Sequence, residues 1–326
     1  MKVHILDDWF DTLRDLTCFE KLTGHEVTVW TDHVEDTDAL AERLQDAEVL
    51  VLFRERTKVT RALLKKLPNL KLISQRSVYP HVDVEACTDH GVLLCSNMHS
   101  GTPSYAAAEL TWALIMAGMR DLPSQMASVK AGRWQAGVGK TLRGRQLGLY
   151  GYGRIARAVS GYAETFGMNV VWWSSEEGRA RAQADGVQVA PSREAFFAGS
   201  DIVSVHVRLK PDTRGIITAS DFAQMQPRAL FVNTSRAGLI APGTLLEALN
   251  AGRPGKAAID VFDTEPLTDP TDPLLAHPNL IATPHIGFVT EDEFDLQFAD
   301  IFDQVNAYAD GAPIHMINPG VWTSAE

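Results

Sequence analysis

The first 95 residues alternate short apolar runs with polar stretches in which apolar residues recur at helical spacing. Strands are expected at Val3–Leu6, Glu26–Trp30, Glu48–Leu52, Leu70–Ser74 and Val92–Leu94. The intervening segments, such as Asp38–Gln45 and Arg61–Leu67, predict amphipathic helices. Because strands and helices alternate, we expect an α/β fold with a parallel sheet covered on both faces.

A longer helical pattern interrupts this alternation. From Gly101 to Ala131 the apolar spacing predicts a long helix, with Thr102 or Ser104 as its cap and a break into a second helix marked by Pro123. The alternation then resumes and closes with an amphipathic helix at Glu291–Ala309. In this second block we expect strands at Gln146–Tyr150, Asn169–Trp173, Ile202–Val207, Ala229–Asn233, Ala257–Ile259 and Leu280–Ala282, and helices at Arg154–Phe166, Arg193–Ala198 and Pro242–Ala251.

Composition narrows the class of protein. The length of 326 residues predicts two domains, and 45% apolar with 22% charged residues is typical of a globular chain. The net charge of −11 provides no basic field, so neither nucleic acid nor a membrane surface is an expected partner. Three sparse cysteines (Cys18, Cys87, Cys95) predict neither disulfides nor a metal site. The first residues do not resemble a secretory signal, and cytoplasm is the expected location.

A glycine-rich turn indicates a dinucleotide site. Gly151-x-Gly153-x-x-Ala156 follows an apolar strand directly and opens a helix. In such a turn the first glycine permits the tight bend and the second lets the backbone approach a pyrophosphate. The helix that begins near Arg154 then presents free N–H groups and its positive end to that anion.

The residue that would choose between NAD and NADP is unusual. Ser174 occupies the place where an acidic residue normally binds the adenosine ribose. The missing carboxylate and the nearby Arg179 and Arg181 favour a 2′-phosphate, whereas Glu176 could reach the ribose of NAD instead. The sequence leaves NAD(H) and NADP(H) both open.

Chemistry-bearing residues follow at the ends of three predicted strands, where ligands of open α/β sheets gather. They are Arg236 in FVNTSRAGLI, Glu265 in AIDVFDTEP and His285 in ATPHIGF. An arginine fork suits a carboxylate, a histidine suits proton transfer near neutral pH, and a glutamate can fix the histidine tautomer. This set suits the reduction of a 2-oxo acid.

The run from Gly148 to Gly287 resembles the D-isomer-specific 2-hydroxyacid dehydrogenases. The motifs that carry the resemblance are GLYGYGRIA, VSVHVRLKPDTRGII, LFVNTSRAGLI, AAIDVFDTEP and ATPHIGF. The resemblance implies two Rossmann-like or flavodoxin-like domains with parallel sheets. A substrate domain (1–97 and 288–326) would be interrupted by an NAD(P)-binding domain (98–287).

The resemblance also implies roles for individual residues. Arg236 would bind the substrate carboxylate, His285 would transfer the proton at the C2 oxygen, and Glu265 would pair with His285. The backbone N–H groups of Arg154 and Ile155 would hold the pyrophosphate. The other expected cofactor residues are Gly151, Gly153, Ser174, His206, Thr213, Thr234, Asp260 and Gly287.

One loop departs from the family pattern. Where many members have glycines that grip the substrate carboxylate, this chain reads SQRSVYPHVD, with Arg76 and Val78 in glycine positions. Ser77 and Val78 remain candidate N–H donors, and Arg76 is a candidate for a second anionic group. Arg54 and Phe288 are further candidates for shaping substrate specificity.

We therefore expect an NAD(P)-dependent reductase of glyoxylate, hydroxypyruvate or a similar small anionic 2-oxo acid, yielding D-2-hydroxy acids. The length leaves no room for an appended regulatory domain. Family resemblance implies a homodimer through the cofactor domain, with the helix from Gly101 as a candidate contact. The alternative is a dinucleotide-sensing, corepressor-like binding protein of the same fold, which would turn over no acid.

Overall fold

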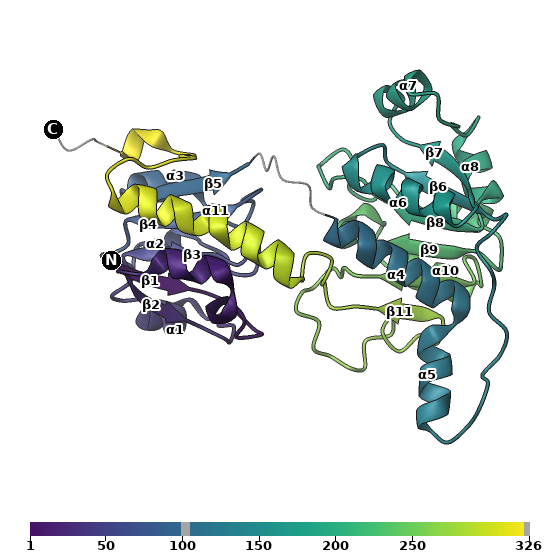
Figure 1. Ribbon diagram of the computed structural model, residues 1–326, viewed down its shortest axis with the longest axis horizontal. Helices are drawn as coiled ribbons and strands as arrows, with labels where there is room; N and C mark the ends of the chain where they lie inside the picture. The colour runs from purple at the N-terminus through teal and green to yellow at the C-terminus, as the bar shows by residue number, and fades with distance from the viewer. Residues whose placement is uncertain (99–104, 323–326) are drawn as a thin grey trace. The chain divides into compact units, whose positions relative to one another are not determined.

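The computed structural model describes residues 1–98 and 105–322, and the chain divides into two compact units (Figure 1). Unit 1 comprises Met1–Pro103 and Thr290–Glu326, and unit 2 comprises Ser104–Val289. Unit 2 is thus an insertion within unit 1. Each unit is a parallel β-sheet covered by helices, which confirms the expected α/β class.

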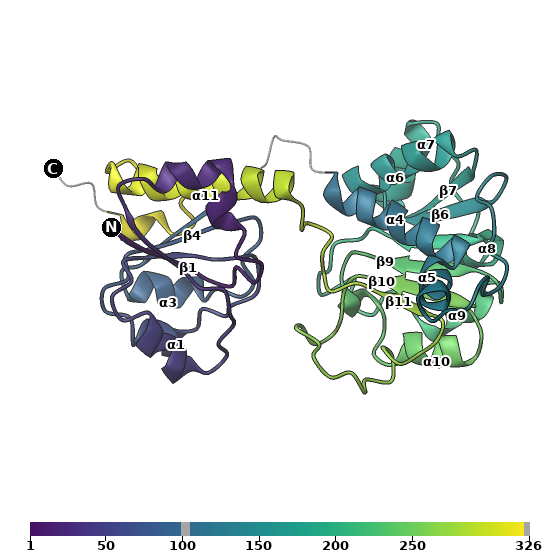
Figure 2. The ribbon, with the colours of Figure 1, turned by 60° about the horizontal axis from the view of Figure 1, so that its bottom comes forward.

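Unit 1 contains a five-stranded parallel sheet in the order β2-β1-β3-β4-β5. Its strands are β1 (Lys2–Ile5), β2 (Glu26–Val29), β3 (Val49–Val51), β4 (Leu72–Arg76) and β5 (Leu93–Asn97). Its helices are α1 (Thr37–Arg43), α2 (Arg61–Leu64), α3 (Val84–Asp89) and α11 (Glu291–Ala309), with short 3-10 helices η1 (Leu13–Asp15), η2 (Thr17–Leu22) and η4 (Pro319–Val321). Figure 2 shows α11 on one face of the sheet and α1 and α3 on the other.

The helix α11 ties the end of the chain to the first sheet. Phe294 and Phe298 on α11 pack against Phe53, with ring centroids 5.0 and 4.9 Å from the Phe53 ring. All three side chains are almost wholly buried, and burial of each phenyl ring contributes about 1.5–3 kcal/mol. This packing explains why the chain returns to unit 1 after completing unit 2.

Unit 2 contains a six-stranded parallel sheet in the order β11-β10-β9-β8-β6-β7. Its strands are β6 (Gln146–Tyr150), β7 (Asn169–Trp173), β8 (Ile202–Val205), β9 (Leu230–Asn233), β10 (Lys256–Ile259) and β11 (Leu280–Ala282). Its helices are α4 (Ala106–Arg120), α5 (Leu122–Lys130), α6 (Arg154–Thr165), α7 (Glu176–Ala184), α8 (Arg193–Gly199), α9 (Ala219–Gln224) and α10 (Thr244–Asn250), with a 3-10 helix η3 (Ala237–Leu239).

The strand order of unit 2 reverses direction at β6, the first strand of this sheet in the chain. From β6 the chain passes to β7 on one side, and it then places β8 on the other side of β6. Ligands of open parallel sheets bind outside the carboxyl ends of the strands at such a reversal. Helices α4 and α6 cover one face of the sheet, and α9 and α10 cover the other (Figure 2).

The expected long helix is confirmed as two helices. Asp121, in the left-handed conformation (φ 55°), separates α4 from α5, and Pro123 lies in the first turn of α5, where its missing N–H costs nothing. The expected cap residues Thr102 and Ser104, and Gly101, lie outside the described residues. Helices α3, α7 and α9 were not expected. Six residues are too few for α3 and α9 to display a helical repeat, and α7 (EEGRARAQA) has no large apolar residue that could show one.

Candidate active site

The turn between β6 and α6 has the geometry of a dinucleotide cradle. Gly151 has φ +115°, and a Cβ on it would lie 2.4 Å from the carbonyl oxygen of His206, so glycine is required there. A Cβ on Gly153, in contrast, would meet no atom within 4 Å. Gly153 precedes α6 and provides no side-chain cap, and the first N–H groups of a helix, here those of Arg154 and Ile155, have no partner within the helix. A pyrophosphate fits these residues.

His206 packs directly against this turn. Its backbone N–H donates to the Tyr150 carbonyl (2.8 Å), and its Nε2 lies 2.9 Å from the Ser204 hydroxyl oxygen. Burial lowers the pKa of His206 to about 4, so the ring is neutral at physiological pH. His206 therefore shapes the turn as an uncharged group.

Two expected cofactor threonines have local hydrogen-bond partners. The Thr213 hydroxyl accepts from the Lys210 N–H and donates to the Arg208 carbonyl, both at 2.7 Å. The hydroxyls of Thr234 and Thr111 lie 2.7 Å apart, which joins the end of β9 to α4. Both threonines hold backbone segments at the carboxyl edge of the sheet.

Ser174 follows the last residue of β7, as expected for the ribose position. Its carbonyl accepts a 2.6 Å hydrogen bond from Arg179, whose guanidinium stacks on Trp173 at 4.3 Å from the ring centroid. A Cβ on Gly178 would lie 2.2 Å from the Ser174 Oγ, so the first turn of α7 lies tightly against this serine. Arg179 is thus held beside the position that distinguishes NAD from NADP.

His285 and Glu265 form a hydrogen-bonded pair. The Nδ1 of His285 lies 2.5 Å from Glu265 Oε2, and Glu265 Oε1 accepts the Phe262 N–H at 2.8 Å. Burial opposes ionisation of Glu265, but the hydrogen bond from His285 and the charges of His285 and Arg236 outweigh it and lower its pKa. With Nδ1 facing the carboxylate, Nε2 is the ring nitrogen left to exchange a proton with a ligand.

Asp260, expected to contact the cofactor, also holds the loop that carries His285. Its wholly buried carboxylate accepts from the Thr283 hydroxyl (2.6 Å) and from the Ile286 and Gly287 N–H groups (2.9 and 2.8 Å). Burial raises the pKa of Asp260, and these hydrogen bonds partly offset the rise. His285 itself has φ 54°, and such left-handed residues at functional sites persist only where the surroundings enforce them.

Arg236 lies in the turn after β9, next to β10 and its Glu265 loop. Its NH1 donates to the Ser235 carbonyl at 2.8 Å, and its charge contributes to the lowered pKa of Glu265. Strand β9 lies beside β10, and β10 beside β11, so the turns of Arg236, Glu265 and His285 follow three successive strands. The structure therefore gathers an arginine cation and a glutamate–histidine pair at one edge of the sheet.

Residues 112–287 match the model of the family described as "D-isomer specific 2-hydroxyacid dehydrogenase, NAD binding domain". The chain belongs to this family. A D-3-phosphoglycerate dehydrogenase of Methanocaldococcus jannaschii is 38% identical over 258 residues, 78% of this chain and 48% of that protein. A glyoxylate reductase of Thermococcus litoralis is 29% identical over 313 residues, 92% of this chain and 93% of that protein.

The fold is shared with solved structures of the family. A Ralstonia solanacearum structure, described provisionally as a D-3-phosphoglycerate dehydrogenase oxidoreductase, has a TM-score of 0.94 and 45% identity, with 99% of this chain and 98% of that chain covered. The chain spans about half the length of the first curated relatives it matches.

In unit 1, the loop that departs from the family pattern is firmly held. Ser77 has φ 76°, and its N–H donates to the Asn97 carbonyl at 3.1 Å. Its carbonyl accepts from Gln75 Nε2 (3.0 Å) and Ser96 Oγ (2.7 Å). The Ser77 N–H, a candidate substrate donor, is therefore already paired within unit 1, whereas Val78 N–H stays a candidate.

The candidate substrate arginines have different surroundings. Arg76 is buried, and its Nε lies 2.9 Å from the Asp300 carboxylate on α11, so it has a structural partner. Arg54 follows β3 with φ 60°, at the same edge of the unit 1 sheet. In unit 2, Phe288 lies edge-on to the His285 ring, with centroids 5.8 Å apart.

Sequence reasoning missed the residues that support the site from behind. The holding of the His285 loop by Asp260 was not expected, nor was a role for Asn233, the last residue of β9. The sequence signal that could have identified both residues was a polar residue at the carboxyl end of an apolar strand, where an unpaired buried polar group is costly. Among the described residues, no group of three His, Cys, Asp or Glu side chains could hold a metal ion, and no helix is both long and apolar enough to span a membrane.

Proposed function

We propose that this chain is an NAD(P)-dependent oxidoreductase that interconverts small 2-oxo acids and D-2-hydroxy acids, of the glyoxylate or hydroxypyruvate class. The observation that carries the proposal is the Glu265–His285 hydrogen bond beside the turn of Arg236, downstream of the Gly151 turn. Relatives named as phosphoglycerate dehydrogenase and glyoxylate reductase support the reaction class.

The Gly151 turn would hold the dinucleotide. The N–H groups of Arg154 and Ile155 would bind its pyrophosphate, and Ser174 with Arg179 would contact the adenosine ribose. When bound, the nicotinamide would supply a hydride to C2 of the 2-oxo acid or accept one from the hydroxy acid.

The protein side chains would position the acid and handle its proton. Arg236 would bind the substrate carboxylate through its planar fork. His285 Nε2 would donate a proton to the C2 oxygen during reduction and accept it during oxidation. Glu265 would keep the proton on Nδ1 and stabilise the charged ring, and Asp260 would hold the loop. Unit 2 would bind the coenzyme, and unit 1, with Arg54 and Val78, would contribute to substrate binding.

A substrate panel tests this proposal. Glyoxylate, hydroxypyruvate, 3-phosphohydroxypyruvate and pyruvate would each be offered with NADH and with NADPH, and coenzyme oxidation followed by absorbance. We expect turnover of at least one acid and a clear coenzyme preference. Tight dinucleotide binding without turnover of any acid would contradict the proposal and favour a dinucleotide-sensing binding protein.

Substitution of the histidine tests its role. His285→Ala is expected to lower kcat by about 10³-fold, because no other group donates the proton, while the coenzyme Kd changes little. Stopped-flow turnover and titration of coenzyme fluorescence would measure the two quantities. Turnover at the wild-type rate in the folded variant would remove His285 from the mechanism.

We also propose that unit 2 mediates a homodimer. The helix α5 and the segment after it expose Met126 (58%), Val129 (57%), Trp134 (75%) and Val138 (93%). Exposed apolar side chains that form one patch are typical of association surfaces, and these four are close together in the sequence. Light scattering is expected to show a dimer that Met126→Glu weakens, and a wild-type monomer at micromolar concentration would contradict this arrangement.

A further inference from the structure

The turn that carries Arg236 is bridged from beneath by one buried amide. Asn233 is the last residue of β9 and is wholly buried. Its Oδ1 accepts the Ser235 N–H at 3.0 Å, and its Nδ2 donates to the Arg236 carbonyl at 3.0 Å. One side chain thus satisfies an inward-facing donor and an inward-facing acceptor of the same turn.

This pattern requires an amide. The turn presents one N–H and one C=O group, and only a side chain with both an acceptor and a donor matches them. A carboxylate of the same shape would keep the bond from Ser235 but would face the Arg236 carbonyl without a proton to donate. An apolar residue would remove both bonds, the one from the Ser235 N–H and the one to the Arg236 carbonyl.

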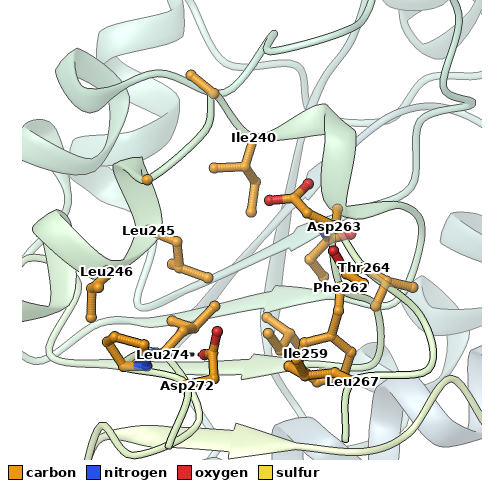
Figure 3. Close-up of a pocket in the computed structure, with 16 residues that line it drawn as sticks. Ile240, Leu245, Leu246, Ile259, Phe262, Asp263, Thr264, Leu267, Asp272 and Leu274 are labelled. Atoms are coloured by element: carbon orange, nitrogen blue, oxygen red, sulfur yellow. Dashed lines mark hydrogen bonds between the residues drawn. The ribbon is translucent and has the colours of Figure 1, made fainter. Parts of the chain in front are cut away.

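The turn borders a hollow of about 240 Å³. Its lining includes Asn233, Ala237 and Ile240, and also Phe262, Asp263, Thr264 and Leu267 from the segment that carries Glu265; Figure 3 labels Ile240 and these last four residues. Other anchors of the turn include the Ser235 hydroxyl, which donates to the Val205 carbonyl at 2.8 Å, and the Thr234 hydroxyl, which lies 2.7 Å from the Thr111 hydroxyl on α4. The Arg236 carbonyl also accepts from the Leu239 N–H at 3.3 Å. The Asn233 amide differs from these anchors because one side chain pairs with two backbone groups of the turn at once.

We propose that Asn233 is a positioning residue that aims the Arg236 guanidinium at the carboxylate of the bound acid. This inference rests on the proposed function, in which Arg236 binds that carboxylate. A displacement of about 1 Å in a positioning group can cost about 10²-fold in rate, so loss of one bridge bond is large enough to measure. Asn233 acts through Arg236 and touches no substrate itself.

The test is Asn233→Asp, measured for both ligands. We expect the KM of the best panel acid, and the Kd of the unreactive analogue oxamate with coenzyme bound, to rise at least about 10-fold, while the coenzyme Kd changes less than about 3-fold. The matched control is Asn318→Asp: that buried amide makes the same kind of bridge in unit 1, between the Leu94 N–H and the Val92 carbonyl. It is expected to change thermal stability without changing the oxamate Kd.

A double-mutant cycle separates positioning from a merely structural role. If Asn233 acts through Arg236, Asn233→Asp should have no further effect on the oxamate Kd in an Arg236→Ala background. An equal effect in both backgrounds, or an unchanged Kd in folded Asn233→Asp, would overturn the inference. If Arg236→Ala alone leaves KM and the oxamate Kd unchanged, the proposed function of Arg236 fails instead.

A milder variant keeps the inference testable if Asn233→Asp does not fold. Ser235→Ala removes the hydroxyl bond to the Val205 carbonyl and leaves the Asn233 bridge bonds intact. We expect the oxamate Kd to rise about 3-fold, because the turn then loses one of the bonds that hold it in place. An unchanged oxamate Kd in this variant would show that the position of the turn does not limit carboxylate binding and would overturn the inference.

Discussion

The carboxyl edges of the two sheets contain left-handed turns of two different kinds. In unit 2, the turn after β6 is a glycine, Gly151, whose missing side chain admits the His206 carbonyl. In unit 1, the loops after β1, β3 and β4 place Asp7 (φ 63°), Arg54 (φ 60°) and Ser77 (φ 76°) in the same conformation. Residues with a Cβ adopt it only at a cost of about 1–2 kcal/mol, so the surrounding structure must enforce it.

Side-chain hydrogen bonds provide that enforcement in unit 1. The buried carboxylate of Asp7 accepts from the Thr57 hydroxyl at 2.6 Å and lies 2.7 Å from His33 Nδ1. The Ser77 carbonyl is held by Gln75 and Ser96. A glycine turn is thus specified locally, whereas the Asp7 and Ser77 loops also depend on partners farther along the chain, such as Thr57 and Ser96.

The largest effect is expected from Gly151→Ala. The new Cβ would lie 2.4 Å from the His206 carbonyl oxygen at a φ unfavourable for alanine, so the turn must move. We expect a loss of about 3–5 kcal/mol in the free energy of unfolding and no detectable coenzyme binding, measured by urea denaturation and fluorescence titration. Gly153→Ala is the matched control, because its Cβ meets nothing in the protein. It should fold normally and weaken only coenzyme binding.

The features that could be predicted from the sequence are those that a few neighbouring residues specify, as Gly151 does for its turn. The Gly151 turn and strands such as Asn169–Trp173 follow from local patterns, and the structure has them where they were expected. The holding of the His285 loop by Asp260 was not predictable, since its partner Gly287 lies 27 positions away and only the strand register brings them together. The same holds for Gln75, whose carbonyl accepts from Gln304 on α11.

The second effect is a pH dependence of the free energy of unfolding, caused by His206 beside the Gly151 turn. Burial lowers the pKa of His206 from 6.5 to about 4, so the unfolded chain binds a proton between these values that the folded chain does not. Stability is therefore complete above pH 6.5 and falls as the pH drops towards 4. The residue keeps some exposure, so we expect a loss of about 1–3 kcal/mol.

Urea denaturation at pH 7 and pH 5 would measure this loss. His206→Gln removes the titrating group, and the difference between the two pH values should shrink by the same amount. An identical pH dependence in wild type and variant would show that His206 is not the group responsible. We expect no such pH dependence from the two bonds to the Ser77 carbonyl in unit 1, because an amide and a hydroxyl donate them and neither titrates in this range.

A smaller effect is expected where α11 supports the Ser77 loop. Arg76 is 7% exposed, and its Nε contacts Asp300 at 2.9 Å. Arg76→Met would leave that carboxylate without its cation and should lower the free energy of unfolding by about 1–3 kcal/mol. Arg61→Met is the control, because the Arg61–Asp89 pair is exposed and its loss should not be measurable. Equal effects of the two substitutions would contradict a structural role for Arg76.

The smallest effect is expected when a glycine is introduced at the left-handed position of Ser77 in unit 1. Ser77→Gly should relieve the left-handed strain and keep the backbone bonds of the loop, so we expect unit 1 to gain about 0.5–1 kcal/mol of stability. Gly186→Ala is the matched opposite: Gly186 has nearly the same φ (75°), a Cβ there meets nothing within 4 Å, and the variant should lose about 1 kcal/mol. Paired urea titrations would measure both. If Ser77→Gly destabilises the protein, the Ser77 side chain contributes more than strain. Since the bonds from Gln75 and Ser96 act on the backbone carbonyl, the glycine variant should leave the loop in place, and this would show that side-chain hydrogen bonds do at Ser77 what the missing side chain does at Gly151.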